Sequence, residues 1–302
     1  MKEQILLVVN DENLYFFPAC SEFTVVSSSR LLTNEYYKEN ISQLAQLELV
    51  VFLDYGFKVA MAEKLRGYTP AKIILFFWNH LTETHLELLR EAQKSAAIDD
   101  IYHFDALEAQ QYNLKHNSSF YRKPDLDPDT IEKKYDLFLG ATNSGRKKEA
   151  DFLQQAFDDM QLSYYFHFLS GIGGHRQAGF MPYHEYLEKT LEAQATVELM
   201  RPGQTGLTLR SLETIYWPIK LVTNNPVIEH YRFYHPDNIF VVGKDPLDQL
   251  PNFLKKPSVP IPSEIKEFYQ PINWAQRFLK EDVDYGELEY HPTLFLKNVS
   301  DL

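Results

Sequence analysis

Residues 49–78 read LVVFLDYGFKVAMAEKLRGYTPAKIILFFW, and their pattern sets the expected architecture. An apolar run at 49–54 is followed by a segment of helical spacing near 56–67 and by a second apolar run at 72–78. Two strands joined by a helix form a βαβ unit, in which the strands lie parallel. Because neither run alternates with polar residues, both strands are expected to be covered on both faces.

The same alternation continues in both directions along the chain. Further apolar strands are expected at residues 4–10, 22–28, 100–105, 135–140, 163–169, 195–200 and 238–243, with helices near residues 34–48, 83–97, 147–160 and 182–194. Residues 125–134 are charged and lack apolar periodicity, which is typical of a linker. The sequence therefore predicts a two-domain α/β protein. It has Rossmann-like domains at 1–124 and 135–302, parallel sheets facing across a cleft, and a last helix free to pack back on the first domain.

The overall charge narrows the classes of partner. The 302-residue chain carries a formal net charge of −12. This argues against nucleic acid as a partner, because such binding relies on neutralising phosphates. With a single cysteine, Cys20, no intrachain disulfide can form, which suits a reducing cytosol. The first apolar run is too short for a signal peptide or a membrane span. A cytoplasmic protein is expected, while peripheral contact with the inner face of the membrane and the oligomeric state stay open.

A loop rich in small residues follows the expected strand 195–200. Its sequence PGQTG leads into a helix that begins near Leu207 or Thr208. Free N–H groups at a helix start attract phosphate, and glycines let a ligand approach the backbone closely. The segment is thus suited to a nucleoside diphosphate, with Arg210 on the phosphates and Glu213 on both ribose hydroxyls. The candidate donor-binding residues here are Gly203, Thr205, Gly206, Leu207, Thr208, Arg210 and Glu213. An ordinary helix cap with an exposed glutamate is the alternative.

A second loop, GATNSGRKKEA, follows the expected strand 135–140. It matches neither the P-loop nor the G-x-G-x-x-G fingerprint, yet a glycine turn into a basic helix start can hold a leaving diphosphate. Its candidate residues are Gly140, Thr142, Gly145, Arg146 and Lys147. A solvated basic helix start is the alternative. A third loop, SGIGGHRQAG at residues 170–179, is interpreted as a surface excursion, with a nucleobase contact as the other option.

The stretch GQTGLTLRSLETIYWPIKLVTNN, residues 203–225, resembles the nucleotide-sugar motif of GT-B glycosyltransferases. YDLFLGATNSGR resembles the first strand and phosphate loop of the same domain. More narrowly, FFWNHL, YHFDALEAQQYNLKHNSSFY and NNPVIEHYRFYHPDNIFVVG resemble bacterial enzymes of capsular and lipopolysaccharide assembly, and the likeness spans roughly residues 50–274. The resemblance implies transfer of a sugar from a nucleoside diphosphate donor to a hydroxyl of a glycan or lipid-linked acceptor, with Glu213 holding ribose.

The chain departs from the family pattern at one important position. The usual motif has two glutamates eight positions apart, and the first of these positions is Thr205 here. This puts the contact to the sugar, and the retaining mechanism often associated with paired glutamates, in doubt. Two further interpretations therefore stay open, a non-catalytic GT-B-like partner subunit and a nucleotide-sugar epimerase.

If the transfer inverts the sugar, a base must deprotonate the acceptor hydroxyl. In GT-B enzymes this base usually comes from the N-terminal half, where Asp11 and Asp54 follow expected strands. Either could equally be a turn or cap residue. Trp78 and Asn79 are candidates for the acceptor side, although Trp78 could equally belong to the core.

Other kinds of chemistry leave no motif in the sequence. The segment DLDPD at 125–129 is interpreted as a linker or helix cap, and the histidines lack H-E-x-x-H spacing, so no metal is expected. There is no G-x-S-x-G elbow of an α/β-hydrolase and no G-x-G-x-x-G after the first strand. No cofactor is expected beyond the donor substrate.

Overall fold

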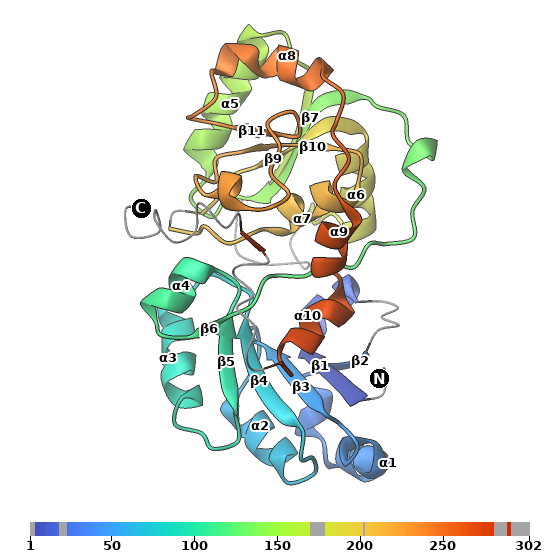
Figure 1. Cartoon of the computed structure of the whole chain (residues 1–302), viewed down its shortest axis with the longest axis vertical. Coiled ribbons are helices and arrows are strands. Elements are labelled where there is room, and N and C mark those ends of the chain that lie inside the picture. The colour runs from blue at the N-terminus through green and yellow to red at the C-terminus, as the bar shows by residue number, and fades with distance from the viewer. Residues whose placement is uncertain (1–3, 18–22, 170–178, 202, 281–288, 291–302) are drawn as a thin grey trace. The chain divides into compact units, whose positions relative to one another are not determined.

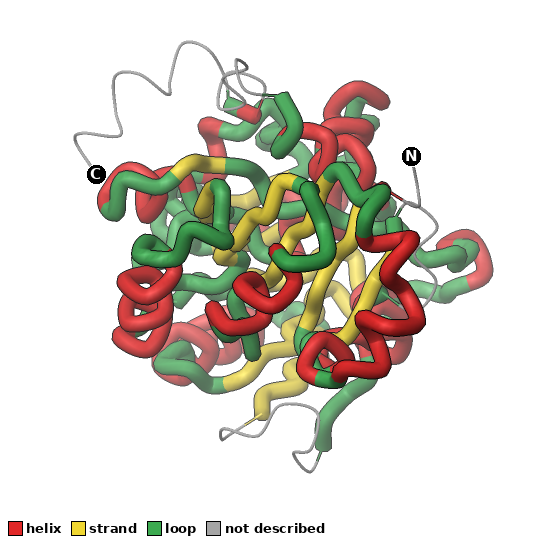
Figure 2. The backbone as a smooth tube through the Cα atoms, turned by 90° about the horizontal axis from the view of Figure 1, so that it is seen from below, coloured by secondary structure: helices red, strands yellow, loops and turns green. Residues whose placement is uncertain are grey.

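The computed structural model describes residues 4–17, 23–169, 179–201, 203–280 and 289–290 (Figure 1). Within these ranges the chain divides into two compact units, one of residues 4–122 with 268–280 and the other of residues 123–267 with 289–290. The chain therefore leaves the first unit near residue 122 and returns to it near residue 268. Figure 2 marks the helices and strands of both units by colour.

The first unit is built on a six-stranded parallel sheet of order β2-β1-β3-β4-β5-β6. Its strands are β1 (Ile5–Val9), β2 (Thr24–Ser27), β3 (Leu49–Leu53), β4 (Lys72–Phe77), β5 (Asp100–His103) and β6 (Lys115–His116). Its helices are α1 (Asn34–Leu44), α2 (Val59–Arg66), α3 (Glu83–Ala92), α4 (Ala106–Gln111) and, from the end of the chain, α10 (Pro271–Arg277). Short 3-10 turns lie at Asp11–Phe16 and Arg30–Leu32.

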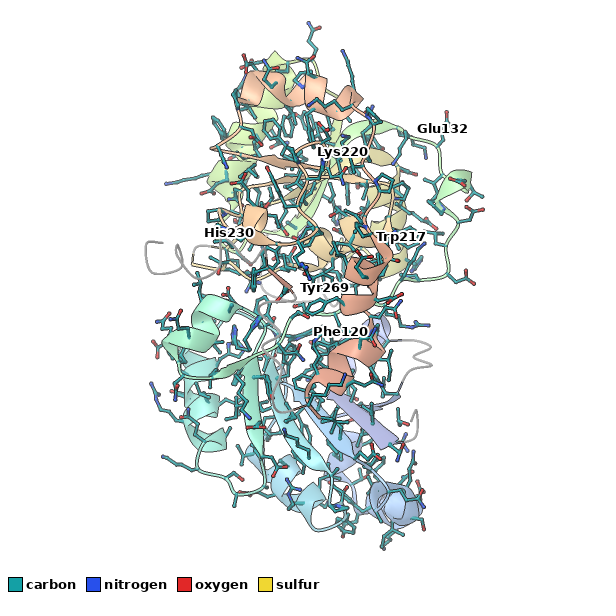
Figure 3. The ribbon with its side chains drawn as sticks, viewed as in Figure 1. Phe120, Glu132, Trp217, Lys220, His230 and Tyr269 are labelled. Carbon is teal, nitrogen blue, oxygen red and sulfur yellow. The ribbon has the colours of Figure 1, made fainter. Side chains whose placement is uncertain are left out.

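Both faces of this sheet are covered, which explains the continuous apolar runs of its strands. On one face, side chains such as Val50 and Phe52 pack against α1, α2 and α3. On the other face, Val51 and Phe76 pack against Trp274 of α10. The ring of Phe120 lies 4.1 Å from that of Trp274 between centroids, and Figure 3 labels Phe120 beside this helix. A helix far away in the sequence thus completes the core of the first unit.

The second unit holds a five-stranded parallel sheet of order β11-β10-β9-β7-β8. Its strands are β7 (Tyr135–Thr142), β8 (Tyr164–Leu169), β9 (Ala193–Glu198), β10 (Lys220–Thr223) and β11 (Ile239–Val241). Its helices are α5 (Lys147–Asp159), α6 (Tyr183–Leu191), α7 (Leu209–Tyr216) and α8 (Leu250–Lys255), and α9 (Ser263–Phe268) leads back to the first unit. Further 3-10 turns lie at Pro128–Thr130, Ile228–His230 and Leu247–Gln249. Helices α5 and α8 cover one face, while α6 and α7 contact the other.

The two sheets share one strand order. In each, the second strand lies on one side of the first, and the third, fourth and fifth continue on the other side. The order therefore reverses between β1 and β3 in the first unit and between β7 and β9 in the second. Ligands of such sheets bind outside the carboxyl ends of the strands at this reversal. The predicted α/β class with two parallel Rossmann-like sheets is confirmed.

Several element boundaries differ from those expected. The helix expected at 182–194 ends at Leu191, because the chain from Ala193 pairs with Tyr135 of β7 and joins the sheet. The strand expected at 135–140 extends to Thr142. Pairing between distant strands overrides the local preference in both places. Within the part of the chain that the structure describes, no helix is long and apolar enough to cross a bilayer.

Candidate functional site

A tight turn follows β7 in the second unit, at the point where the strand order reverses. The backbone N–H of Arg146 donates to the carbonyl of Asn143 across 2.7 Å. Ser144 and Gly145, the two residues between them, have positive φ values of 36° and 86°. Glycine adopts such a conformation without strain, which explains its place in this turn. The turn delivers Arg146 to the start of α5.

Arg146 lies between the ends of two strands. Its side chain is buried, with the residue 8% exposed, and its Nη1 donates to the carbonyl of Leu199 just beyond β9, at 2.9 Å. The guanidinium thus spans β7 and β9 at the position where ligands of such sheets are found.

Arg210, in the first turn of α7, approaches the same place. Its Nη2 donates to the carbonyl of Gly140, and its guanidinium carbon lies 5.8 Å from the centroid of the Tyr186 ring. A Cβ atom at Gly140 would lie only 2.7 Å from that ring. Glycine is therefore required at this position by close packing with Tyr186.

Within the described part of the chain, neither of these guanidinium groups forms an ion pair, although Glu198 acts on Arg146 and Arg210 acts on Glu213. Burial and the nearby charges of Arg210 and Arg201 lower the pKa of Arg146 to about 10, although Glu198 opposes the effect. Among the described residues, the buried Nε atoms of Arg146 and Arg210 have no hydrogen-bond partner, and neither residue forms an ion pair. Buried charges in proteins are normally paired. We therefore define the arginine cluster as Arg146, Arg201 and Arg210.

A carboxylate beside Arg146 is fully engaged with hydroxyl groups. Glu198 ends β9 and is 0% exposed. Its Oε1 accepts from Thr208 at 2.5 Å and from Ser211 at 2.6 Å, and its Oε2 accepts from Thr223 at 2.5 Å. This network ties β9, the start of α7 and β10 together. The sequence analysis missed Glu198, although a lone carboxylate inside the apolar run ATVELM was a usable signal.

Glu213 is closed off in this structure. It is 0% exposed, its Oε1 accepts from the Tyr183 hydroxyl at 2.9 Å, and its Oε2 accepts from the Tyr186 hydroxyl at 3.4 Å. Burial raises the pKa of Glu213 to about 7, partly offset by the charge of Arg210. The exposed carboxylate of the helix-cap alternative is therefore not what the structure shows. An open carboxylate ready for ribose is not seen either, because the tyrosines occupy both oxygens.

The remaining candidates of the 203–208 loop have mostly structural contacts. Gly203 has a φ of +83°, and the carbonyl of Thr205 accepts from the side chain of Asn225 at 3.0 Å. Gly206 is buried, and Leu207 is buried at 3% exposure. Thr208 caps α7 by accepting from the N–H of Arg210.

Two candidates of the second loop, GATNSGRKKEA, have contacts of their own. The Thr142 hydroxyl lies 3.1 Å from that of Ser144. The side chain of Lys147 is 58% exposed and forms an ion pair with Asp151 one turn along α5. Lys147 therefore behaves as the basic helix start of the alternative interpretation. Residues 170–178 of the third loop lie outside the described residues.

In the first unit, Asp54 follows β3 and is 2% exposed. Its Oδ1 accepts from the backbone N–H of Trp78 at 3.0 Å. Its Oδ2 accepts from the side chain of Asn79 at 3.0 Å and also lies 3.1 Å from Nε2 of His85. The three predicted residues Asp54, Trp78 and Asn79 are thus brought together. Asp54 holds the loop after β4 rather than presenting a free carboxylate.

Asp11, the other predicted base, lies at the surface. Its Oδ1 accepts from the Ser29 hydroxyl at 2.7 Å. Slight burial raises the pKa of Asp11, but hydrogen bonds from Ser29 and Ser27 outweigh it and hold the pKa below its ordinary value. A carboxylate stabilised in this way is a weaker base.

A second buried carboxylate holds the other end of the same loop. Glu108 is 6% exposed and follows Asp105, which caps the start of α4. Oε2 of Glu108 accepts from the N–H of Leu81 at 3.3 Å and lies 3.1 Å from Nε2 of His103. Oε1 of Glu108 lies 2.7 Å from Nδ1 of His80. The sequence analysis did not select Glu108 or these histidines, although FFWNHL was among the segments that carry the resemblance.

No metal site emerges from the part of the chain that the structure describes, because no group of three or more His, Cys, Asp or Glu side chains there is arranged to hold an ion.

The fold has counterparts among solved structures. No family model matches the chain, and no curated protein sequence matches it. An alpha-glucosyltransferase in complex with UDP and a 13-mer DNA containing a central A:G mismatch is similar to it, with 12% identity, 98% of each chain covered and a TM-score of 0.50. An alpha-glucosyltransferase in complex with UDP-glucose and DNA containing an abasic site has 11% identity, covers 83% of this chain and 88% of its own, and has a TM-score of 0.48. The chain therefore has the GT-B fold of glycosyltransferases.

Proposed function

We propose that the protein is a glycosyltransferase that uses a nucleoside diphosphate sugar. The observation that carries this proposal is the arginine cluster at the strand reversal of the second sheet. The charges of Arg146 and Arg210 act on each other, and the buried Nε atoms of both have no hydrogen-bond partner among the described residues. A diphosphate would supply the missing negative charge and accept several hydrogen bonds at once. In the transfer step the same groups would stabilise the leaving diphosphate.

The start of α7 adds to this donor site. Its first N–H groups and the helix dipole favour an anion, and Thr208 fixes where the helix begins. Glu213, one turn further on, is the proposed ribose contact. The hydroxyl of Tyr183 must then give up the Glu213 oxygen that it occupies when ribose arrives.

The acceptor proposed is a hydroxyl of a glycan or lipid-linked oligosaccharide in bacterial surface polysaccharide synthesis, as the resemblance of the sequence implies. The similar solved structures contain DNA, which makes nucleic acid the competing acceptor. The net charge of −12 favours the glycan, because a protein that binds DNA must neutralise phosphates.

Nucleotide binding tests the donor site directly. Titration calorimetry with UDP, GDP and dTDP should show at least one of them binding with a Kd below about 1 mM, the upper end of ordinary substrate affinities. Arg146→Gln and Arg210→Gln should each weaken that binding roughly ten- to hundredfold, the scale of a charge-assisted hydrogen bond. The matched control is Arg90→Gln, because Arg90 is exposed on α3 in the first unit.

Thermal melting of the same variants separates ligand binding from a structural role. If the arginine cluster serves to bind an anion, its positive charges repel one another in the unliganded protein. Removing one of them should relieve this repulsion, so unliganded Arg146→Gln should have a melting temperature no lower than that of the wild type. A lower melting temperature with unchanged nucleotide affinity would make Arg146 a structural tether of Leu199 and remove the proposal's main support. The absence of binding by all three nucleotides at millimolar concentration would have the same effect.

Turnover then separates the enzyme from its alternatives. Wild-type protein should consume a nucleoside diphosphate sugar and transfer the sugar to a lipid-linked oligosaccharide but not to duplex DNA. Binding without turnover would favour the non-catalytic partner subunit. Conversion of the donor into its epimer without any acceptor would favour the epimerase.

A further inference from the structure

The loop after β4 in the first unit is held at both ends by buried carboxylates. Asp54 accepts from the N–H of Trp78 at its start, and Glu108 accepts from the N–H of Leu81 at its end. Residues 78–81 are thus fixed at the carboxyl edge of the first sheet, where ligands of parallel sheets bind. Such a loop can present a side chain to a substrate with little freedom left to lose.

Three histidines contact these two carboxylates. In two of them, His85 and His103, the other ring nitrogen accepts from a backbone N–H. His85 places Nε2 on Asp54, and its Nδ1 accepts from the N–H of Thr82 at 3.2 Å. His103 places Nε2 near Glu108, and its Nδ1 accepts from the N–H of Asp105 at 3.0 Å. These two rings therefore serve to hold the structure.

His80 differs from the other two. Its Nδ1 lies 2.7 Å from Oε1 of Glu108, a separation at which an unprotonated nitrogen would repel a carboxylate. The ring is not aligned for a hydrogen bond to that oxygen, and the short separation is attractive when Nδ1 carries a proton. Among the described residues, Nε2 of His80 has no partner, and the side chain is 26% exposed.

We propose that His80 is the group that takes the proton from the acceptor hydroxyl, with Glu108 as its positioning residue. The inference rests on the proposed glycosyl transfer. A neutral imidazole with its proton held on Nδ1 by a carboxylate exposes a basic Nε2, which is the arrangement of a general base. Asp54 is buried and engaged, and Asp11 is stabilised as a carboxylate, so His80 is better suited to the role than either aspartate.

The lone pair of His80 Nε2 accepts the hydroxyl proton, and the acceptor oxygen forms a bond to the anomeric carbon of the sugar. The bond between that carbon and the diphosphate oxygen breaks, and the electron pair leaves with the nucleoside diphosphate. The imidazolium that forms is stabilised by the Glu108 carboxylate, while Asp54, His85 and His103 are the other titratable groups packed around the loop.

The test compares nucleotide binding with turnover in the full-length protein. The probes are UDP-glucose, UDP-galactose, GDP-mannose and dTDP-glucose, with release of nucleoside diphosphate as the readout and water or added glycan as the acceptor. His80→Ala should lower the rate of the sugar nucleotide that the wild type consumes by about 10²- to 10⁴-fold, the usual contribution of a general base. Its affinity for the nucleoside diphosphate should stay within about twofold of wild type, because the donor contacts lie in the second unit.

Two readouts distinguish a base from a merely structural histidine. Added imidazole should restore part of the rate of His80→Ala, and the acidic limb of the pH–rate profile should disappear in that variant. Glu108→Gln should lower the rate and keep nucleotide affinity. The control is His235→Ala, because the His235 side chain is 41% exposed in the second unit, and its rate should stay at the wild-type value.

The assignment of His80 would be wrong if His80→Ala kept the wild-type rate, or if imidazole did not restore the lost rate. In either case, nucleotide binding by the wild type would leave the proposed function intact. Loss of nucleoside diphosphate binding by the wild type would instead refute the proposed function itself. Tautomer measurement by ¹H–¹⁵N NMR provides a check that needs no substrate. A neutral His80 ring protonated on Nε2 would also rule out the assignment.

Discussion

Single residues at the carboxyl edges of both sheets carry charges that the fold alone does not need. In the second unit, the buried Nε atoms of Arg146 and Arg210 have no hydrogen-bond partner among the described residues, and neither guanidinium forms an ion pair there. In the first unit, His80 has one ring nitrogen on a carboxylate and the other without a partner there. A buried charge without a partner lowers stability, and a basic nitrogen without a partner adds nothing to it. Function is therefore the better explanation for the two arginines and for His80.

Glu213 gives a prediction about pH at this scale. Its pKa is raised by burial from 4.5 to about 7, so the folded protein binds this proton more tightly than the unfolded chain. The stabilising effect of that proton is fully present below about pH 4.5 and is lost as pH rises to about 7. The difference corresponds to about 3 kcal/mol as an upper bound.

Glu213→Gln should therefore gain stability relative to wild type as pH rises, because glutamine stays neutral and can still accept from a tyrosine. Urea denaturation of both proteins at pH 5 and pH 8 measures the change, and comparing the two proteins cancels the titration of every other group. A gap between wild type and variant that does not change with pH would show that Glu213 titrates normally in the folded protein.

At the scale of elements, the start of α7 is positioned by one buried carboxylate. Glu198 of β9 accepts from Thr208 and Ser211 of α7 and from Thr223 of β10. Three hydroxyl groups from two neighbouring elements thus converge on a single side chain with no exposure. The position of the helix relative to the arginine cluster depends on this network.

Glu198→Gln should loosen α7. The amide NH₂ of glutamine cannot accept the hydrogen bond that one of these hydroxyls now donates, and Arg146 loses a nearby negative charge. The expected cost is about 1–3 kcal/mol. Hydrogen exchange of the α7 amides should then be about tenfold faster or more. Glu188→Gln, at an exposed position on α6, is the matched control and should exchange as the wild type does. Equal protection of α7 in both variants would make the network dispensable.

At the scale of the whole molecule, the end of the chain completes the unit in which the chain begins. Trp274 of α10 is 0% exposed and packs edge-on against Phe76 of β4, with 5.2 Å between ring centroids. Burying an aromatic side chain of this size contributes several kcal/mol. The first unit therefore depends on a segment that follows residues 123–267 of the second unit in the sequence.

Trp274→Ala should destabilise the first unit by about 3–5 kcal/mol and leave the second unit unchanged. Hydrogen exchange localises the effect: amides of β1, β3 and β4 should exchange faster, and those of β7 and β9 should not. The reciprocal control is Trp217→Ala, because Trp217 is buried at 3% exposure in the second unit (Figure 3) and should affect β9 and β10 instead. Faster exchange in both units after Trp274→Ala would mean that they unfold together.

The architecture was predictable because it depends on local repetition. Apolar runs separated by helical segments recur along the chain, and parallel sheets bury such runs on both faces. The turn at Gly145 and the cap at Asp105 were likewise visible, since glycine suits a positive φ and aspartate suits a helix start. The end of α6 was not, because strand pairing of Ala193 decided it.

What the amino-acid order alone determined about this protein is its class and the loops worth attention, because periodicity and turn chemistry act between near neighbours. Only the tertiary structure decided which charges are compensated. In the sequence, all three of Arg146, Glu198 and Glu213 are charged residues beside apolar runs. In the structure, the buried Nε of Arg146 has no hydrogen-bond partner among the described residues, Glu198 accepts from hydroxyl groups, and Glu213 is covered by tyrosines. These differences arise from groups brought together across the sheet, and electrostatic cost depends on such neighbours and on burial rather than on position in the chain.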